Sequence, residues 1–498
     1  MINFKLKNPA VGFGLSLAVL TVVFFPLFTG NFVYLDEAYQ LWHNHDGSDF
    51  TYFFVQGRWL SGKLFSQVFS HLSVIADLKL ARIISFLSWA AFLGEFFRLG
   101  RKWQTAIGFD GILLLAGGIY IACSPSLAVY IGWASCFVCG IASILGLWSG
   151  HLFFCILTNK RKPSLITISL AVLLGIASLF IYQIAFSCFF LPFVFYFIKN
   201  RAGSFRLLKF FAAGYVIISV LYYLLFIFTL KYSSVQPSTR TALSFDVFGR
   251  LAFFLGVPLA RAFSFNFLYN MHSVVSQAFP IVMMVLWVVS TWKRDGGNPG
   301  RALTTIAIFL VLGLFTYVPV LVAKEDFSSY RTMFALNLTA VLILFDMITG
   351  YSGKLKEYMP AVTGLAVVCF VVVGTFNFHI NYIAPLGEEY GVIHNYFDRK
   401  YDTGVHTVYF LRPPENLFHK KYGINQYNDE LGLPSTYRDW TPEPLVKQII
   451  LERTGSRAIA ENIQVTQFAD STLFKNQRAK ALPNSMYIDV GTLYSKGY

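Results

Sequence analysis

Apolar stretches of about 20 residues, separated by short polar connections, recur through the first 378 residues of the chain. A helix needs about this length to cross a bilayer, where every backbone polar group must find its partner within the protein. A membrane β-barrel would show alternating segments of about ten residues instead. The pattern predicts a polytopic α-helical membrane protein with about eleven transmembrane helices. We expect them near residues 9–29, 80–98, 108–127, 133–157, 164–182, 184–199, 207–230, 275–292, 302–322, 333–349 and 359–377.

Lysine and arginine residues fall in every second short loop between these predicted helices. Such an excess is typical of cytoplasmic loops, so the N-terminus, with Lys5 and Lys7, is expected inside. The same alternation places three larger segments on the outer side: 30–79, 231–274 and 379–498. The basic loops are 98–102, 160–162, 199–209, 293–301 and 354–356.

Two of the outer segments contain apolar patterns that are not predicted to span the membrane. Between residues 57 and 72, apolar residues recur at helical spacing opposite a polar side that includes Ser61 and Lys63. This pattern predicts an amphipathic helix on the membrane surface. The stretch 249–268 could be a twelfth span, but a further span would invert the alternation of basic loops. We therefore expect an interfacial or re-entrant helix there.

The last outer segment, 379–498, has the mixed composition of a small soluble α+β domain, and about 120 residues are enough to bury a core. Thr441-Pro442 is typical of a helix N-terminus and Gly455 of a helix end. Residues 405–411 and 486–490 have the composition of strands. The sequence thus predicts a soluble domain on the outer side of the membrane after the transmembrane domain.

Composition supports a membrane protein and argues against a nucleic-acid partner. Of the 498 residues, 55% are hydrophobic and 13% are charged, whereas ordinary soluble domains have roughly 25% charged residues. The net charge is +14. Residues 379–498 carry 13 basic and 13 acidic residues, so the whole excess lies in residues 1–378. Membrane topology therefore explains the positive charge.

Cysteine and histidine residues indicate neither a disulfide framework nor a metal site. All six cysteines lie in or beside apolar stretches, and Cys136 and Cys139 are interpreted as small packing residues. His43, His45 and Asp46 come nearest to a metal cluster, but their spacing matches no established ligand motif. The sequence requires no cofactor.

Two adjacent carboxylates, Asp36 and Glu37, follow the first predicted span on the outer side. A carboxylate held at the boundary of water and lipid loses hydration, which can raise its pKa and strengthen it as a base. The alternative is an ordinary acidic loop. The pair alone does not favour either interpretation.

Cations are expected on the same side of the membrane as this acidic pair. Outer loops are normally poor in arginine, and the guanidinium group forms a rigid fork that binds phosphate oxygens. We therefore expect a site for a lipid phosphate, although a snorkelling side chain is the alternative for any single cation. The candidates are Arg58, Lys63, Arg240, Arg261 and Arg331.

Five short motifs follow one another along the chain and together resemble a known family. They are Leu35-Asp36-Glu37, Gly57-Arg58-Trp59-Leu60, Ile181-Tyr182-Gln183, Tyr330-Arg331-Thr332 and Asp429-Glu430-Leu431-Gly432-Leu433-Pro434. The set resembles the bacterial O-antigen glucosyltransferases of the Gtr type II family, within the GT-C superfamily of glycosyltransferases that use polyprenyl-phosphate sugars. The family pattern has two aspartates where this chain has Asp36 and Glu37, which leaves open which carboxylate is catalytic.

The resemblance implies transfer of a hexose, expected to be glucose, from a polyprenyl-phosphate donor to lipid-linked O-antigen or a related surface glycan, at the periplasmic face of the bacterial inner membrane. Only some members of the superfamily use a divalent cation. Residues expected to contact the sugar or the acceptor are Trp42, Asp46, Trp59, Tyr182, Gln183, Asp429 and Glu430.

The residue chemistry suits that reaction. The leaving phosphate is already acidic and needs no general acid, so cations are enough to stabilise its charge. The acceptor hydroxyl does need a base, for which Asp36 is the first choice, with Glu37 orienting the acceptor or exchanging roles with it. One base without a covalent nucleophile implies inversion at the anomeric carbon.

Three other classes of protein fit the same topology, and a channel or a purely structural scaffold is the least favoured of them. A transporter or flippase would place its polar groups near the bilayer midplane, whereas the candidates here gather at one face. An O-antigen polymerase or acyltransferase would use the same acceptor. Movement of a labelled sugar from a prenyl carrier to a glycan would separate a glycosyltransferase from all three.

Overall fold

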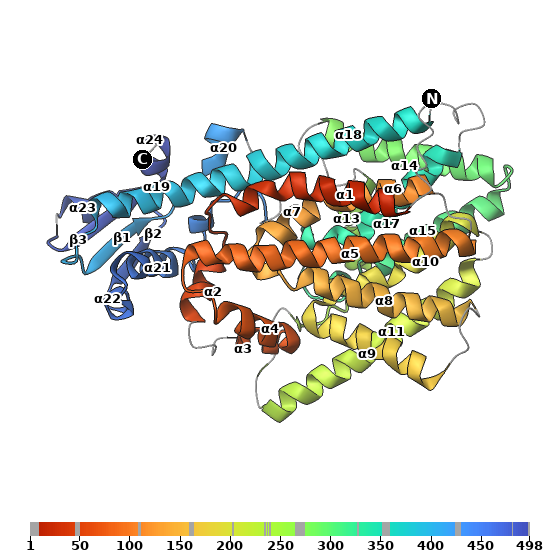
Figure 1. Cartoon of the computed structure of the whole chain (residues 1–498), viewed down its shortest axis with the longest axis horizontal. Helices are drawn as coiled ribbons and strands as arrows, with labels where there is room; N and C mark the ends of the chain where they lie inside the picture. The colour runs from red at the N-terminus through yellow and green to blue at the C-terminus, as the bar shows by residue number, and fades with distance from the viewer. Residues whose placement is uncertain are drawn as a thin grey trace.

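The computed structural model describes residues 9–44, 50–107, 111–158, 164–201, 204–233, 236, 238, 241–263, 274–325, 328–350, 359–423, 430–480 and 482–496. These residues are mostly helical, and a small sheet lies at the C-terminal end of the chain (Figure 1). The longer helices run roughly along the long axis of the molecule, and the C-terminal segment projects from one end of this helical part.

Each predicted span contains an apolar helix. Among the described residues, five helices are long and apolar enough to cross a membrane, or six if one bent pair counts as a single span. The structure is thus mostly helical and compatible with a helical membrane protein, whereas the number of eleven spans stays a prediction because other apolar helices are shorter. The helices are α1 (Pro9–Phe24), α5 (Leu78–Ile107), α6 (Gly111–Cys123), α8 (Cys139–Leu157), α9 (Leu165–Ile181), α10 (Leu191–Lys199), α11 (Ser204–Ser233), α14 (Val274–Arg294), α15 (Pro299–Phe315), α17 (Phe334–Gly350) and α18 (Met359–Phe378).

The bent pair consists of α6 and α7 (Pro125–Gly132), which meet at 48°. Pro125 lacks the N–H that would continue α6, and the Ser124 hydroxyl accepts a bond from Leu127 N to begin a new helix. A short 3₁₀ turn, η3 (Ala134–Cys136), then leads into α8. The connection at residues 133–135 lies beside the first loop, where its residues contact Asp36 and Glu37.

The predicted domain boundary at residue 379 falls inside one long helical run. Helix α18 continues through a π-helical turn, η7 (His379–Ile383), into α19 (Ala384–Lys400), and this run extends from the helical part to the C-terminal segment (Figure 1). The buried apolar residues of both parts also belong to one continuous cluster. The C-terminal segment is therefore packed onto the helical part.

The C-terminal segment differs from the expected α+β domain because its sheet is parallel. Strands β1 (Thr407–Leu411), β2 (Gln464–Phe468) and β3 (Ser485–Asp489) lie in the order β2-β1-β3. Parallel strands require long crossovers, and helices occupy these connections in an α/β arrangement. They are α20 (Leu417–Tyr422), α21 (Pro442–Thr454), α22 (Arg457–Glu461) and α23 (Ser471–Ala479), and α24 (Val490–Lys496) follows β3.

The strands at 405–411 and 486–490 are confirmed within two residues, and β2 was not predicted. Helix α21 begins and ends as expected, and Gly455 adopts a left-handed φ of 66° after it. Thr441 is the N-cap residue of α21 as expected, although its side chain makes no capping bond and its hydroxyl donates to Leu35 O.

The loops that are predicted to lie on the outer side form short helices. The first loop contains α2 (Glu37–His43), α3 (Thr51–Val55), α4 (Trp59–Phe69) and a 3₁₀ turn, η2 (Ile75–Asp77). The stretch predicted to be interfacial forms α12 (Val247–Gly256) and α13 (Pro258–Phe263) rather than a span. Ser61 does not lie on a polar outer side of α4, because its hydroxyl is buried and donates to Ile181 O at 2.6 Å.

The first loop and the C-terminal segment are in direct contact. Ile75 N donates to Glu452 Oε1 at 2.7 Å, and Gln448 Nε2 donates to Ser73 O at 2.8 Å. Helices α2 and α21 also pack against each other. The acidic pair at the start of α2 therefore lies where the helical part, the first loop and the C-terminal segment meet.

Candidate active site at the end of the helical part

The turn that presents the acidic pair is held in a strained conformation. Leu35 has a φ of 46°, a left-handed value that costs a non-glycine residue about 1–2 kcal/mol. Both of its backbone groups are fixed, because Leu35 N donates to Ser435 Oγ at 3.2 Å and Leu35 O accepts from Thr441 Oγ1 at 3.1 Å. The C-terminal segment thus sets the direction in which Asp36 leaves the backbone.

Asp36 is held by three side chains and remains partly exposed. Trp133 Nε1 donates to Asp36 Oδ1 at 2.8 Å, Ser135 Oγ donates to the same oxygen at 3.3 Å, and Gln40 Nε2 donates to Oδ2 at 3.1 Å. Burial raises the pKa of Asp36, while the Trp133 bond and the charge of Arg331 oppose that shift. Asp36 is therefore an oriented carboxylate with strengthened basicity.

Glu37 has a different environment from Asp36, since it is fully buried. Its Oε2 accepts from Arg82 Nη2 at 2.6 Å and from Tyr34 N at 2.7 Å, and its Oε1 accepts from Ala134 N at 2.5 Å. Burial raises its pKa to about 7 although Arg82 favours the ionised form. With both oxygens engaged, Glu37 is placed to hold the turn rather than to contact a substrate.

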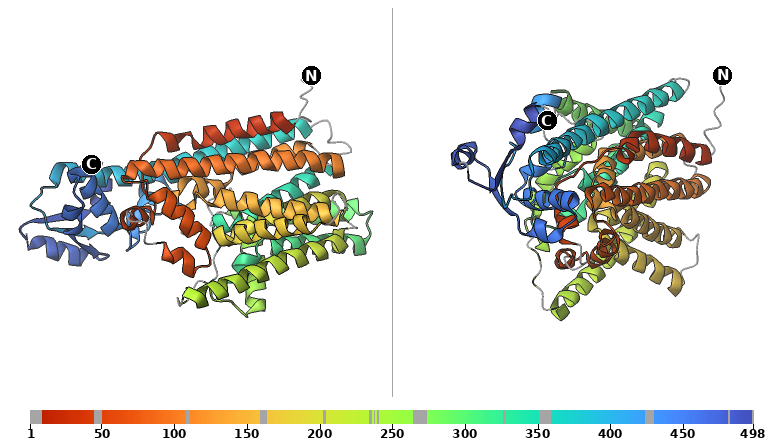
Figure 2. Two further views of the ribbon diagram at one scale, coloured as in Figure 1. Left: turned by 60° about the horizontal axis from the view of Figure 1, so that its bottom comes forward. Right: turned by 60° about the vertical axis from the view of Figure 1, so that its left-hand side comes forward.

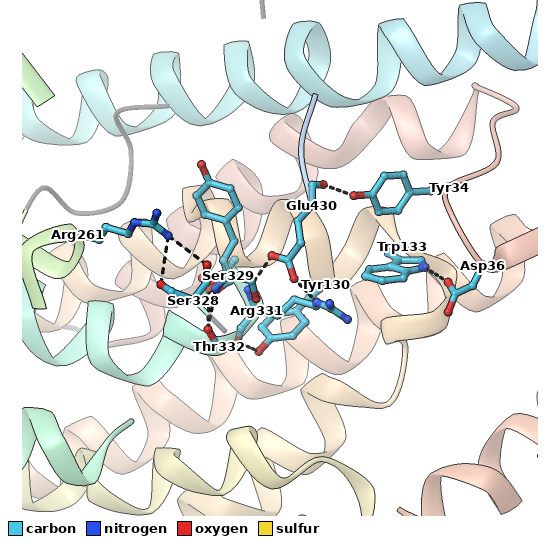
Figure 3. A network of polar contacts seen from close by, with 12 residues as sticks. Tyr34, Asp36, Tyr130, Trp133, Arg261, Ser328, Ser329, Arg331, Thr332 and Glu430 are labelled. Atoms are coloured by element: carbon cyan, nitrogen blue, oxygen red, sulfur yellow. Dashed lines mark hydrogen bonds and ion pairs between the residues drawn. The ribbon is translucent and has the colours of Figure 1, made fainter. Parts of the chain in front are cut away.

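A third carboxylate, Glu430 of the C-terminal segment, pairs with Arg331 at the start of η6 (Arg331–Met333). Arg331 Nε donates to Glu430, which is fully buried, and Arg331 N also donates to Glu430 Oε2 at 3.2 Å. The Arg331 guanidinium lies over the Trp133 ring at 4.3 Å. Figure 3 shows that Trp133 lies between Arg331 and Asp36, so this indole touches both the carboxylate and the cation.

Arg58 occupies a second cationic position, between the first loop and the start of η4 (Gln183–Phe190). Its Nε donates to Gln183 Oε1 at 2.8 Å, and its guanidinium lies 4.9 Å from the Tyr182 ring. Gln183 Nε2 in turn donates to Gln56 O at 2.9 Å and to Tyr222 Oη at 2.8 Å. The predicted Tyr182-Gln183 turn therefore orients Arg58.

Tyr130 connects these two clusters. Its hydroxyl donates to Arg331 O, and its ring lies 6.3 Å from the Tyr182 ring. The guanidinium groups of Arg331 and Arg58 are both close enough to the Tyr182 hydroxyl to interact with it electrostatically. The structure therefore brings together Asp36, Arg58, Tyr182, Gln183, Arg331 and Glu430, which the sequence analysis had selected from five separate motifs.

Other predicted site residues lie farther from this cluster or have different surroundings. Arg261 Nη1 donates to Ser328 O and Oγ, both at 3.1 Å, and so supports the loop before Arg331. Lys63 is exposed on α4. Trp42 is buried beneath the Arg457 guanidinium at 4.2 Å, which leaves no open face for a sugar.

Trp59 is 38% exposed and packs against Phe180, so one side of its ring remains available. Arg240, Asp46 and Asp429 lie outside the described residues, as does His45. Within the described residues, no three His, Cys, Asp or Glu side chains gather in a group that could hold a metal ion.

Sequence reasoning missed Trp133, Ser135, Gln40, Tyr130 and Arg82. Arg82 could have been found, because it is a cation at the outer end of a predicted span and thus meets the criterion applied to the other outer arginines. Trp133 carries no such signal, since one tryptophan in an uncharged connection is typical of a membrane interface.

The fold and these contacts define a helical, membrane-associated protein with a polar site at one end of its helical part. A scan against models of known protein families and a search of curated proteins find no match to the chain.

Proposed function

We propose that the protein is a membrane glycosyltransferase that transfers a hexose, expected to be glucose, from a polyprenyl-phosphate donor to a lipid-linked surface glycan. The observation that carries the proposal is the arrangement of Asp36, Trp133 and Arg331, which joins an oriented carboxylate to a guanidinium group through one indole. A transfer between a hydroxyl acceptor and a phosphate leaving group needs these two functions side by side.

The cations suit a phosphate leaving group. Within the parts of the chain that the structure describes, the side chains of Arg58 and Arg331 form hydrogen bonds through Nε alone. The terminal amino groups of both side chains are thus available for phosphate oxygens, which guanidinium groups bind in a bidentate way. Their charge would stabilise the leaving phosphate as it forms.

Asp36 is the proposed general base. The acceptor hydroxyl gives its proton to an Asp36 carboxylate oxygen while the hydroxyl oxygen attacks the anomeric carbon. The bond from that carbon to the phosphate oxygen breaks, and the phosphate leaves with the electron pair. Glu37 does not take part directly and positions the turn through Arg82. A single displacement of this kind inverts the anomeric configuration.

The location of the site also supports this assignment. The site lies at one end of the apolar helices, where a prenyl chain in the bilayer and a sugar outside it would meet. The predicted residues that meet there all come from the motifs that resemble the Gtr type II family. The proposed location is the periplasmic face of the bacterial inner membrane.

The proposal can be tested with purified full-length protein in lipid nanodiscs. The donor probe is polyprenyl-phosphate [¹⁴C]glucose, and the acceptor is lipopolysaccharide with O-antigen. We expect label on the glycan with the wild-type protein, and a loss of about a hundredfold or more with Asp36→Asn. Glu443→Gln is the matched control, because Glu443 forms an exposed ion pair with Lys447 that contributes little.

Retention of full activity by Asp36→Asn would overturn the mechanism. Label that crosses the bilayer without reaching the glycan would favour a flippase instead.

A further inference from the structure

An exposed aromatic and cationic surface lies in the segment 430–441, which we call the strap. Its most exposed aromatic residue is Trp440, at 44%. The Arg438 guanidinium lies 5.5 Å from the Trp440 ring and 5.6 Å from the Tyr437 ring. These three side chains combine a flat apolar face with a charged hydrogen-bond donor.

The strap is fixed along its length, so this surface is preorganised. Glu389 of α19 accepts from Ser435 N at 2.8 Å and from Thr436 N at 2.9 Å. Arg412 Nη1 donates to Tyr437 O at 3.2 Å. A surface held in this way loses little conformational freedom when a ligand binds.

The strap is adjacent to Asp36, the proposed base. Thr441, the residue after Trp440, donates to Leu35 O, and Ser435 accepts from Leu35 N. Leu35 directly precedes Asp36. At its other end the strap carries Glu430, which pairs with Arg331. The strap therefore links the exposed tryptophan to both the base and the cation.

We propose that Trp440 and Arg438 form a subsite for the acceptor glycan. This inference rests on the proposed function and names where its second substrate binds. The C–H face of a pyranose ring is apolar and packs on the indole, while the guanidinium group donates to hydroxyl or carboxylate groups of the chain. Trp42, chosen from the sequence for such a role, is covered by Arg457, whereas Trp440 is open.

A glycan is favoured over a lipid surface as the occupant for two reasons. Asp439, beside Trp440, is exposed. Its charged carboxylate would have to be buried together with Trp440 if this surface inserted into an acyl layer, which is unfavourable. The strap also belongs to the C-terminal segment, which projects beyond the apolar helices (Figure 2).

The first test measures kinetics of the full-length protein in nanodiscs. Trp440→Ala should raise the KM for lipopolysaccharide about tenfold or more, because a stacked ring is lost, while the KM for polyprenyl-phosphate glucose changes little. Trp440→Phe should recover part of the loss. Trp292→Ala is the matched control, since Trp292 is 46% exposed and lies in the last turn of α14.

The second test measures binding without turnover. The probe is O-polysaccharide released from lipopolysaccharide by mild acid, followed by saturation-transfer NMR with Asp36→Asn protein. Signals should be present with Asp36→Asn alone and absent when Trp440→Ala is added.

The outcomes separate the two proposals. No glucose transfer by the wild-type protein would overturn the proposed function. Transfer with an acceptor KM unaffected by Trp440→Ala would overturn the subsite alone. Quenching of Trp440 by brominated lipids, with no effect of polysaccharide, would assign this surface to the membrane instead.

Discussion

Trp133 Nε1 lies 2.8 Å from Asp36 Oδ1, although the two residues are far apart in the sequence. The next residue, Ala134, donates its backbone N–H to Glu37. One short connection between α7 and α8 therefore holds both members of the acidic pair. It directs Asp36 to the cluster that contains Arg331 and directs Glu37 into the protein.

Replacement of Trp133 by phenylalanine should alter the pH dependence of transfer. The indole N–H stabilises the ionised form of Asp36, so its loss raises the pKa of Asp36 further. Because the base acts when ionised, activity disappears as pH falls through this pKa. The acidic limb of kcat/KM in Trp133→Phe should therefore lie at higher pH than in the wild type. An unchanged limb, in protein that still binds donor, would contradict the role of Trp133.

The ion pair of Glu37 with Arg82 should matter for stability. Both side chains are almost fully buried, and removal of one partner leaves an uncompensated group, at a cost of about 3–5 kcal/mol. We expect Glu37→Gln and Arg82→Met each to lower the thermal unfolding temperature, and the double variant to lose less than the sum of the two. Glu37→Gln protein that is as stable as wild type yet inactive would instead make Glu37 a direct participant.

Arg331 should be sensitive to a change that preserves its charge. Lysine cannot reproduce the planar fork or the stacking on Trp133. Arg331→Lys should therefore raise the KM for the polyprenyl-phosphate donor by about tenfold or more. Arg478→Lys, at an exposed position of α23, is the matched control. Equal donor KM values in the two variants would argue against phosphate binding by Arg331.

Gly57 should not tolerate a side chain. It has a φ of +70°, and a Cβ atom there would clash with the Tyr222 hydroxyl. Gly57→Ala should displace Arg58 and reduce both stability and transfer. Gly296 has a φ of +67°, but a Cβ atom added there would meet no other atom within 4 Å, so Gly296→Ala carries only the backbone strain of about 1 kcal/mol. Similar losses in the two variants, measured by thermal unfolding and glucose transfer, would exclude a specific role for the Tyr222 contact.

The features of the fold that the sequence predicts correctly are local ones. The apolar helices, the amphipathic α4 and two of the three strands follow from periodicity and composition, which a single segment contains. Strand β2 was missed because Gln464–Phe468 mixes polar and apolar residues, none of them fully buried, and it becomes a strand through its pairing with the distant β1. The start of α21 at Thr441-Pro442 was predicted correctly, but the bond from the Thr441 hydroxyl to Leu35 O was not, because its partner is distant in the chain.

The candidate site was partly predictable for the same reason. Asp36, Arg58 and Arg331 are unusual residue types at their positions, so sequence alone selects them. Their mutual arrangement depends on Trp133, whose partners are distant in the chain and whose residue type is common at membrane interfaces. The different environments of Asp36 and Glu37 likewise depend on Arg82 in α5.

The most direct test of the central claim is structural analysis of surface polysaccharide from cells that express the wild-type chain or Asp36→Asn at matched levels. The host must make both the prenyl-linked glucose donor and an O-antigen acceptor. We predict an added hexose branch with the wild type and none with Asp36→Asn. A branch of equal abundance in both strains, or its absence in both, would contradict the assignment of Asp36 as the base of a glycosyltransferase.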